Sequence, residues 1–143
     1  MRKIFSLILA CLLTILVHAQ EHKAGAIIER YDASFTMASQ TSGTYKVNMR
    51  VCILDKESAD EAVFLAYADG FKSLSSFSGV LESGGKTIKK YKMSDLKTVS
   101  VGEGGITDAT VSYLEPVAPV PYVVEYTYEV SYKNGVISFP TFI

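Results

Sequence analysis

Cysteine and histidine, the side chains that most often act as nucleophiles or metal ligands, are few in this sequence. Its 143 residues include Cys11, Cys52, His18 and His22. A cysteine nucleophile needs a base beside it, and a zinc site needs three or four ligands. Cys52 falls on the second face of a strand-like stretch with no histidine near it in sequence, so a small buried side chain is the favoured interpretation. We therefore predict no catalytic residue, no metal site and no enzyme.

The stretch "SGGKTIKK", residues 83–90, contains Gly85-Lys86-Thr87, a tripeptide also found in phosphate-binding loops. Such a loop needs a glycine five residues before Gly85, so that its backbone amides can wrap the phosphates, and Val80 holds that position. A helix should follow the loop, whereas residues 87–92 have the pattern of a strand. The glycines therefore indicate a hairpin turn, and we predict no cofactor.

Four carboxylates lie close together in the stretch "DKESADE": Asp55, Glu57, Asp60 and Glu61. Clustered oxygen ligands are what calcium prefers, but this stretch lacks the glycine and the ligand spacing of a calcium loop. We interpret it as a solvated loop or a single helical turn.

Tyrosines alternate along the stretch "PYVVEYTYEVSYKNGV", residues 121–136. Each even position of its first part is aromatic or β-branched: Tyr122, Val124, Tyr126, Tyr128, Val130 and Tyr132. Tyrosine suits sugar stacking and protein contacts, because an apolar ring carries one polar group. A face shared with valines is more often core, so we expect a central strand with its even face buried. A ligand-binding wall is the alternative.

The first nineteen residues have the pattern of a secretory signal peptide. Arg2 and Lys3 precede an apolar run at residues 4–17, and Val17-His18-Ala19 fits a cleavage site before Gln20. The run is shorter than the roughly 20 residues that cross a bilayer, so we expect no stable membrane insertion after cleavage. The sequence predicts export to the periplasm or the medium.

A lipoprotein cleavage box at Ile8-Leu9-Ala10-Cys11 is a less favoured alternative, because cleavage there would leave the apolar residues 12–17 on the mature chain. Loss of residues 1–19 would also remove Cys11 and His18. Cys52 would then be the one remaining cysteine, which makes an intramolecular disulfide impossible.

The composition is that of one globular domain. Hydrophobic residues make up 48% of the chain, and the formal net charge is -1. This charge gives no basic excess, so nucleic acid is excluded as an expected partner. We predict a signal peptide at residues 1–19, a flexible leader at 20–29 and one monomeric domain at 30–143.

Period-two alternation dominates that domain, and no sustained helical period appears. Ser94 is expected to cap one helical turn at residues 95–97, and Asn134-Gly135 is a strong hairpin signal. The prolines at positions 116, 119 and 121 indicate an edge or a linker. Strands are expected at residues 30–38, 45–54, 62–67, 77–82, 87–92, 98–101, 111–114 and 122–132. Short strands in this number predict an antiparallel β-sandwich or barrel.

Three stretches carry a family resemblance: "YKVNMRVCILDKE" at 45–57, "GKTIKKYKMSDLKTVSV" at 85–101 and "VVEYTYEVSYKN" at 123–134. From about Tyr31 onward the chain resembles the N-terminal all-β domain of unknown function that precedes transglutaminase-like domains in exported bacterial proteins. The resemblance implies an immunoglobulin-like sandwich, a non-catalytic companion to a cysteine-protease-like domain. Prolines replace the family's glycine-containing turn before Tyr122, and the family's catalytic positions match no residue here.

After Asn134-Gly135 a returning strand is expected at residues 136–139, followed by Pro140 and by Thr141-Phe142-Ile143. Either this segment docks into the core or the domain is incomplete at its C-terminal side, and a truncated or degenerate copy is the favoured interpretation. The predicted function is a non-catalytic exported β-sandwich that binds or supports a protein or glycan partner. The alternative is a small-ligand or carbohydrate-binding protein whose tyrosines line a barrel or sandwich interior.

Overall fold

The computed structural model describes residues 24–101 and 108–134. Several predicted features lie outside these residues. They are the signal peptide with Cys11 and His18, His22, and the returning strand at 136–139. Among the described residues, no helix combines the length and apolar character needed to cross a bilayer.

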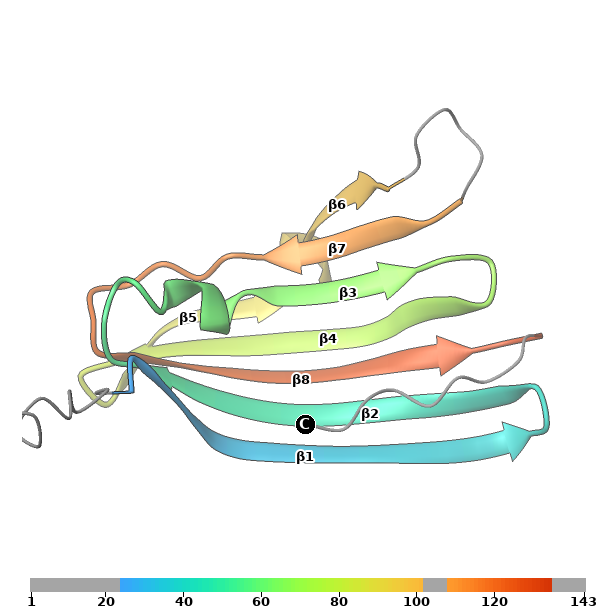
Figure 1. Ribbon diagram of the computed structural model, residues 1–143, viewed down its shortest axis with the longest axis horizontal. Helices are drawn as coiled ribbons and strands as arrows, with labels where there is room; N and C mark the ends of the chain where they lie inside the picture. The colour runs from blue at the N-terminus through green and yellow to red at the C-terminus, as the bar shows by residue number, and fades with distance from the viewer. Residues whose placement is uncertain (1–23, 102–107, 135–143) are drawn as a thin grey trace, which may run out of the picture.

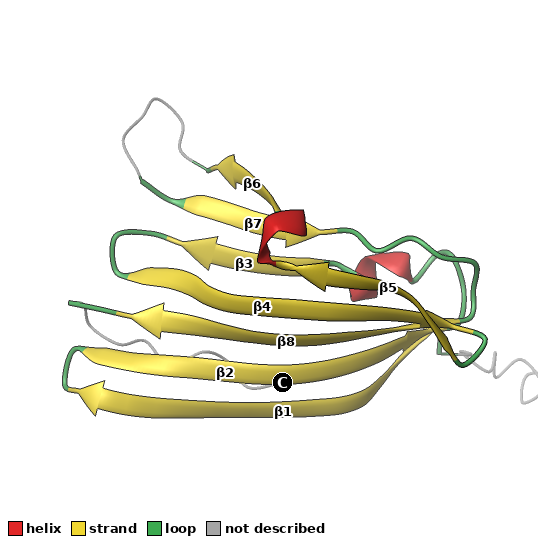
Figure 2. Cartoon of the chain, turned by 180° about the vertical axis from the view of Figure 1, so that it is seen from behind, coloured by secondary structure: helices red, strands yellow, loops and turns green. Residues whose placement is uncertain are grey.

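The described chain forms two antiparallel sheets, as Figures 1 and 2 show from opposite sides. The five-stranded sheet has the order β1-β2-β8-β4-β5, and the three-stranded sheet has the order β3-β7-β6. The first contains β1 (Ala26–Ser39), β2 (Ser42–Ile53), β8 (Tyr122–Tyr132), β4 (Lys72–Ser83) and β5 (Lys86–Lys92). The second contains β3 (Phe64–Ala68), β7 (Thr110–Leu114) and β6 (Lys97–Ser100). The predicted all-β antiparallel sandwich is confirmed.

Within the described residues, two single-turn 3-10 helices connect strands: η2 (Ala59–Ala62) and η3 (Met93–Asp95). The first lies in the charged stretch where a loop or a helical turn was expected. The second begins two residues before the predicted turn at 95–97, and Ser94 is not its cap. Instead the Asp95 carboxylate accepts a hydrogen bond from the Lys92 N–H at 2.8 Å. An acid at the end of the turn can fold back onto its start, which the sequence pattern did not reveal.

Three strands begin at least three residues before their predicted bounds, and one of them is β2, which begins at Ser42 rather than at residue 45. β1 begins at Ala26 rather than at residue 30, so four residues of the expected leader belong to the strand. β4 begins at Lys72 rather than at residue 77. In the first half of β4 serines separate Leu74 from Phe77, so the apolar alternation that marks a strand is weak there, and pairing with β8 determines the structure instead.

β8 is the central strand of the five-stranded sheet, as its length and alternation predicted. It pairs with β2 on one side and with β4 on the other along its whole length. Its even face points into the sandwich, where Val124 and Tyr126 have no exposed surface and Tyr122 is 3% exposed. The first half of the even face, from Tyr122 to Tyr126, is therefore part of the core and not a ligand-binding wall.

The turn between β4 and β5 is the glycine hairpin that the sequence predicts. Gly84 and Gly85 have φ angles of +57° and +72°, and β5 follows directly as a strand. Residues with a Cβ rarely adopt two successive positive φ values, which explains the glycine pair without a phosphate-binding role.

The core consists of two clusters. In the larger one the Phe64 ring from β3 contacts Phe77 and Tyr126, with ring centroids 4.5 and 5.5 Å apart, and so joins the two sheets. The smaller one is centred on Tyr45, Val47 and Val130 of the five-stranded sheet. In both views β3, β7 and β6 lie on the β4 side of the molecule, away from β1 and β2.

Candidate binding site

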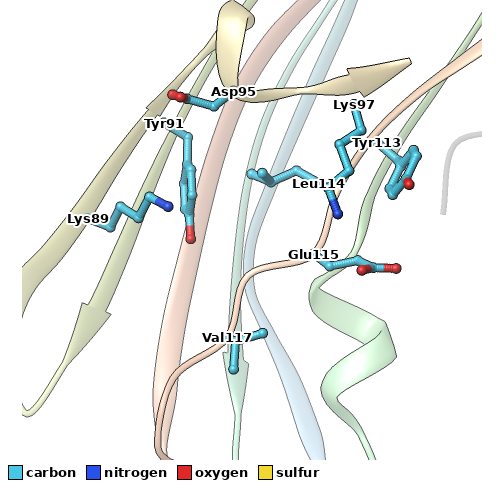
Figure 3. Close-up of a pocket in the computed structure, with 8 residues that line it drawn as sticks. All are labelled: Lys89, Tyr91, Asp95, Lys97, Tyr113, Leu114, Glu115 and Val117. Atoms are coloured by element: carbon cyan, nitrogen blue, oxygen red, sulfur yellow. The ribbon is translucent and has the colours of Figure 1, made fainter. Parts of the chain in front are cut away.

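A groove opens where the chain crosses between the two sheets. It has a volume of about 360 Å³ and lies between β5, the edge strand of the large sheet, and the outgoing end of β7 (Figure 3). Its lining combines charged, aromatic and apolar side chains: Lys89, Tyr91, Asp95, Lys97, Tyr113, Leu114, Glu115 and Val117. We call it the β5–β7 groove.

The wall on β5 is built by alternation along the strand. Lys89 and Tyr91 are two residues apart and therefore share one face, and the Lys89 ammonium lies 4.8 Å from the centre of the Tyr91 ring. Tyr91 faces Gly79 of β4 across the ladder. A Cβ at position 79 would lie 3.1 Å from the Tyr126 ring, so the glycine lets Tyr91 and Tyr126 pack closely.

The opposite wall depends on the pairing of β6 with β7. Lys97 is directly across from Tyr113 in the ladder, and its ammonium lies 5.5 Å from the centre of that ring. The helix η3 places Asp95 just before Lys97, at the end of the groove near β5. Both lysines are thus held over a ring face, an arrangement that keeps an ammonium in place while it remains accessible to a ligand.

The electrostatics of the groove are mixed. Two ammonium groups and two carboxylates, from Asp95 and Glu115, face one space. Burial is the main cause that raises the pKa of Tyr91, and the negative charge of Asp95 raises it further. The Tyr91 hydroxyl therefore stays protonated at neutral pH and can donate or accept a hydrogen bond. This set of groups suits the recognition of a ligand that carries both charges and apolar surface.

Sequence reasoning did not select any of these eight residues. A usable signal exists in "KTIKKYK" of β5, where Lys89 occupies the inward-facing position next to Tyr91. An inward lysine in an alternating strand marks a place where the sandwich interior opens to water. The residues on the opposite wall of the groove could not be found in the same way. They come from β6 and β7, and no local sequence pattern predicts that these two strands pair.

The residues that the sequence did single out are dispersed. Cys52 lies in β2 opposite Ile27 and Val123, on the same face of the strand as Arg50 and remote from the β5–β7 groove. The Asp55 carboxylate accepts a hydrogen bond from the Ser58 N–H at 2.9 Å. Residues 24–101 and 108–134 contain no group of three or more histidines, cysteines or carboxylates arranged to hold a metal ion.

The tyrosine face divides into two parts. Tyr126 is fully buried and packs against both Phe64 and Phe77, so it is a core residue. Tyr128 and Tyr132 instead reach a second groove, of about 240 Å³, whose other lining residues are Tyr45, Leu65, Ala66, Tyr67, Lys72 and Val130. A carrier with Tyr126 and Tyr128 around one cavity does not match this geometry.

Comparison with known proteins supports the fold. No family model matches the sequence. No curated protein matches it either. Its fold is similar to that of a crystal structure of a candidate protease from Parabacteroides distasonis, with a TM-score of 0.65 and 11% sequence identity over 78% of this chain. The match covers 24% of the other chain, so this chain spans about a quarter of that protein's length. At this identity the likeness establishes shared architecture alone.

Proposed function

We propose that this chain is a non-catalytic, exported β-sandwich domain that binds a protein partner through the β5–β7 groove. The observation that carries the proposal is the composition of the groove, which brings two lysines, two carboxylates and two tyrosine rings together in one space of about 360 Å³. Specific protein contacts combine such charged groups with aromatic anchors. The predicted signal peptide supports a periplasmic or secreted location.

The fold neighbour supports an accessory role. The sandwich corresponds to about a quarter of that longer chain, so in that protein an equivalent sandwich is joined to further polypeptide. The resemblance to domains that precede transglutaminase-like domains suggests the same arrangement, with a partner of the cysteine-protease-like class. In such an arrangement this domain needs only to bind its partner, and the partner carries out the catalytic reaction.

A polypeptide fits the groove better than a glycan. Sugar stacking needs an open aromatic face, but Lys89 covers one face of Tyr91 and Lys97 covers one face of Tyr113. A polypeptide supplies charges of both signs to meet the lysines and carboxylates. It also supplies apolar side chains for Val117, which is 85% exposed at the groove.

Site-specific photo-crosslinking tests the proposal in the cell that makes the protein. A photo-reactive amino acid is introduced at Val117 in the groove or, as control, at Ile88, which is 52% exposed and next to Lys89 but on the opposite face of β5. We expect one discrete protein adduct from position 117 and none from position 88. The adduct should be lost when Lys89→Glu and Lys97→Glu are combined with the probe. Equal adducts from both positions, or none, would refute the proposal.

A further inference from the structure

The groove of about 240 Å³ that Tyr128 and Tyr132 reach lies beside β3, an edge strand of the small sheet. Within the described residues β3 pairs with β7 alone. From β3 the groove takes Leu65, Ala66 and Tyr67, and from β8 it takes Tyr128, Val130 and Tyr132. We call it the β3-edge groove. Both sheets therefore contribute to it, and it uses the half of the tyrosine face that lies beyond Tyr126.

The tyrosine rings of this groove keep open faces. Tyr67 is 57% exposed. Tyr128 and Tyr132 each make an edge-to-face contact with a phenylalanine, with ring centroids 5.1 and 5.5 Å apart, and such a contact occupies at most one face of a ring. In residues 24–101 and 108–134, the ammonium groups that lie over tyrosine rings both belong to the β5–β7 groove. The open aromatic face that sugar stacking needs is therefore present at β3.

Two of these tyrosines also offer hydroxyls. Among the described residues the hydroxyls of Tyr128 and Tyr132 make no hydrogen bond, and no buried side-chain oxygen lacks a partner, so both hydroxyls are open to water. Burial raises the pKa of Tyr128 to about 12. Burial also raises the pKa of Tyr132, and the negative charge of Asp69 adds to this. Both hydroxyls stay protonated at neutral pH and can donate and accept hydrogen bonds.

The charged groups at this end of the sandwich balance each other. Lys72 lines the groove and pairs with Tyr132 in the ladder of β4 and β8. The Asp69 carboxylate accepts hydrogen bonds from the Phe71 N–H at 2.8 Å and the Lys72 N–H at 3.0 Å, so the turn before β4 holds the acid close to the lysine. One charge of each sign gives no net attraction for an ionic ligand. A neutral polar ligand is favoured instead.

We infer that the β3-edge groove binds a neutral pyranose ring of a glycan, stacked on Tyr67. One face of such a ring presents C–H groups, which suit an aromatic surface, and its hydroxyls suit the ammonium of Lys72 and the tyrosine hydroxyls. The volume of about 240 Å³ is below the roughly 300–1,000 Å³ of sites for drug-sized ligands, so one sugar ring fits better than a larger molecule.

An extended peptide suits the groove less well. β3 lines it with three residues, which leaves few backbone groups for an added strand to pair with. The inference does not depend on the proposed function, because the β3-edge groove and the β5–β7 groove share no lining residue. A glycan and a polypeptide can therefore bind to the domain at separate places.

Saturation-transfer NMR with the full chain tests the inference. The neutral probes are the methyl glycosides of glucose, galactose, mannose and N-acetylglucosamine. Methyl glucuronide is the anionic comparison, and a capped tetrapeptide of alternating valine and threonine is the extended one. We expect saturation of the ring C–H protons in at least one neutral glycoside and little in the two comparison molecules. No response from the neutral glycosides, or an equal response from either comparison molecule, overturns the inference.

Variants of the full chain locate the site. Tyr67→Ala removes the stacking ring and should lower the response of the bound glycoside at least about fivefold, whereas Tyr67→Phe keeps the ring and most of the response. Lys72→Met removes the ammonium and should lower the response without touching the ring. Ile88→Ala is the matched control, because Ile88 is 52% exposed and lines neither groove. A full response in both Tyr67→Ala and Lys72→Met, or an equal loss in Ile88→Ala, contradicts the assignment.

Discussion

The hydroxyl of Tyr126 donates a hydrogen bond to the backbone oxygen of Ala62 at 2.7 Å, in the centre of the sandwich. Tyr126 belongs to β8 of the large sheet, and Ala62 is the last residue of η2, just before β3 of the small sheet. The bond therefore joins the two layers and pairs a carbonyl that the core removes from water. Burial raises the pKa of Tyr126 well above its usual value, so the donor proton is held at all physiological pH values.

Replacement of Tyr126 by phenylalanine tests this bond. Tyr126→Phe keeps the ring but leaves the Ala62 oxygen without the hydroxyl, and a buried acceptor that loses its donor costs about 1–3 kcal/mol. We expect the free energy of unfolding in urea to fall by that amount with an unchanged m-value. Tyr67→Phe is the matched control, because Tyr67 is 57% exposed and its change should stay within about 0.5 kcal/mol. Equal effects of the two changes would contradict the assignment.

Alkaline pH should destabilise the fold through its tyrosines. Burial, with smaller contributions from Tyr31 and Tyr132, raises the pKa of Tyr128 from 10.0 to about 12. Between these values the unfolded chain releases the proton while the folded chain keeps it, so stability is complete below pH 10 and falls as pH rises. The slope for one tyrosine is about 1.4 kcal/mol per pH unit.

Urea unfolding at pH 9, 10 and 11 measures this slope. Tyr128→Phe removes the contribution of Tyr128 to the pH dependence of the free energy of unfolding and leaves the lysines unchanged. The variant should therefore lose less stability per pH unit than the parent chain. Parallel pH profiles would show that Tyr128 does not keep its proton in the folded state.

Close packing at Gly79 gives a third prediction. In Gly79→Ala the added Cβ would lie 3.1 Å and 3.2 Å from two carbons of the Tyr126 ring and 3.4 Å from the Tyr91 Cβ. Both rings are buried, so relief requires movement of the core, and we expect a loss of about 1–3 kcal/mol in thermal or urea unfolding. The neighbouring change Ser78→Ala, on the exposed face of β4, serves as control. A neutral Gly79→Ala would mean that the rings can move apart.

Arg50 organises the outer face of the large sheet. Its guanidinium contacts Glu29 at 2.8 Å, Glu82 at 2.8 Å and Glu125 at 3.1 Å, and thus connects β1, β4 and β8. Arg50→Ala leaves these carboxylates to repel one another, and we expect a loss of about 1–2 kcal/mol that shrinks in high salt.

The control for Arg50 is Lys46→Ala. Lys46 makes a single ion pair with Glu129 at 3.1 Å, and its side chain is 57% exposed. Such a pair contributes about 0.5 kcal/mol or less. If both changes cost the same, the network around Arg50 adds nothing beyond one surface ion pair.

The fold was largely predictable because its strands alternate. The even face of β8 and the glycine hairpin at Gly84-Gly85 each follow from local rules on burial and φ, and both were predicted. The start of β4 was not, because the serines between Lys72 and Phe77 break the alternation, and this part of the strand exists through pairing with β8.

The candidate site could not be predicted from the sequence. Lys97 and Tyr113 are sixteen residues apart and meet only because β6 pairs with β7. Strand pairing of this kind is set by tertiary packing, for which a single sequence carries no local signal. The inward position of Lys89 is the one clue that period-two analysis could have used.

The reactivity of Cys52 distinguishes a catalytic thiol from a structural one. Cys52 is partly buried near the end of β2, between Ile27 and Val123 of the adjacent strands. A catalytic thiol is accessible and held as a thiolate by a cation or a base, whereas a structural one reacts slowly. We expect a thiol reagent to label the folded chain beginning at Gln20 at least about tenfold more slowly than the same chain in urea, because strand pairing restricts access. Labelling of the folded chain that is faster than that of the unfolded chain would identify an activated cysteine and would contradict the non-catalytic proposal.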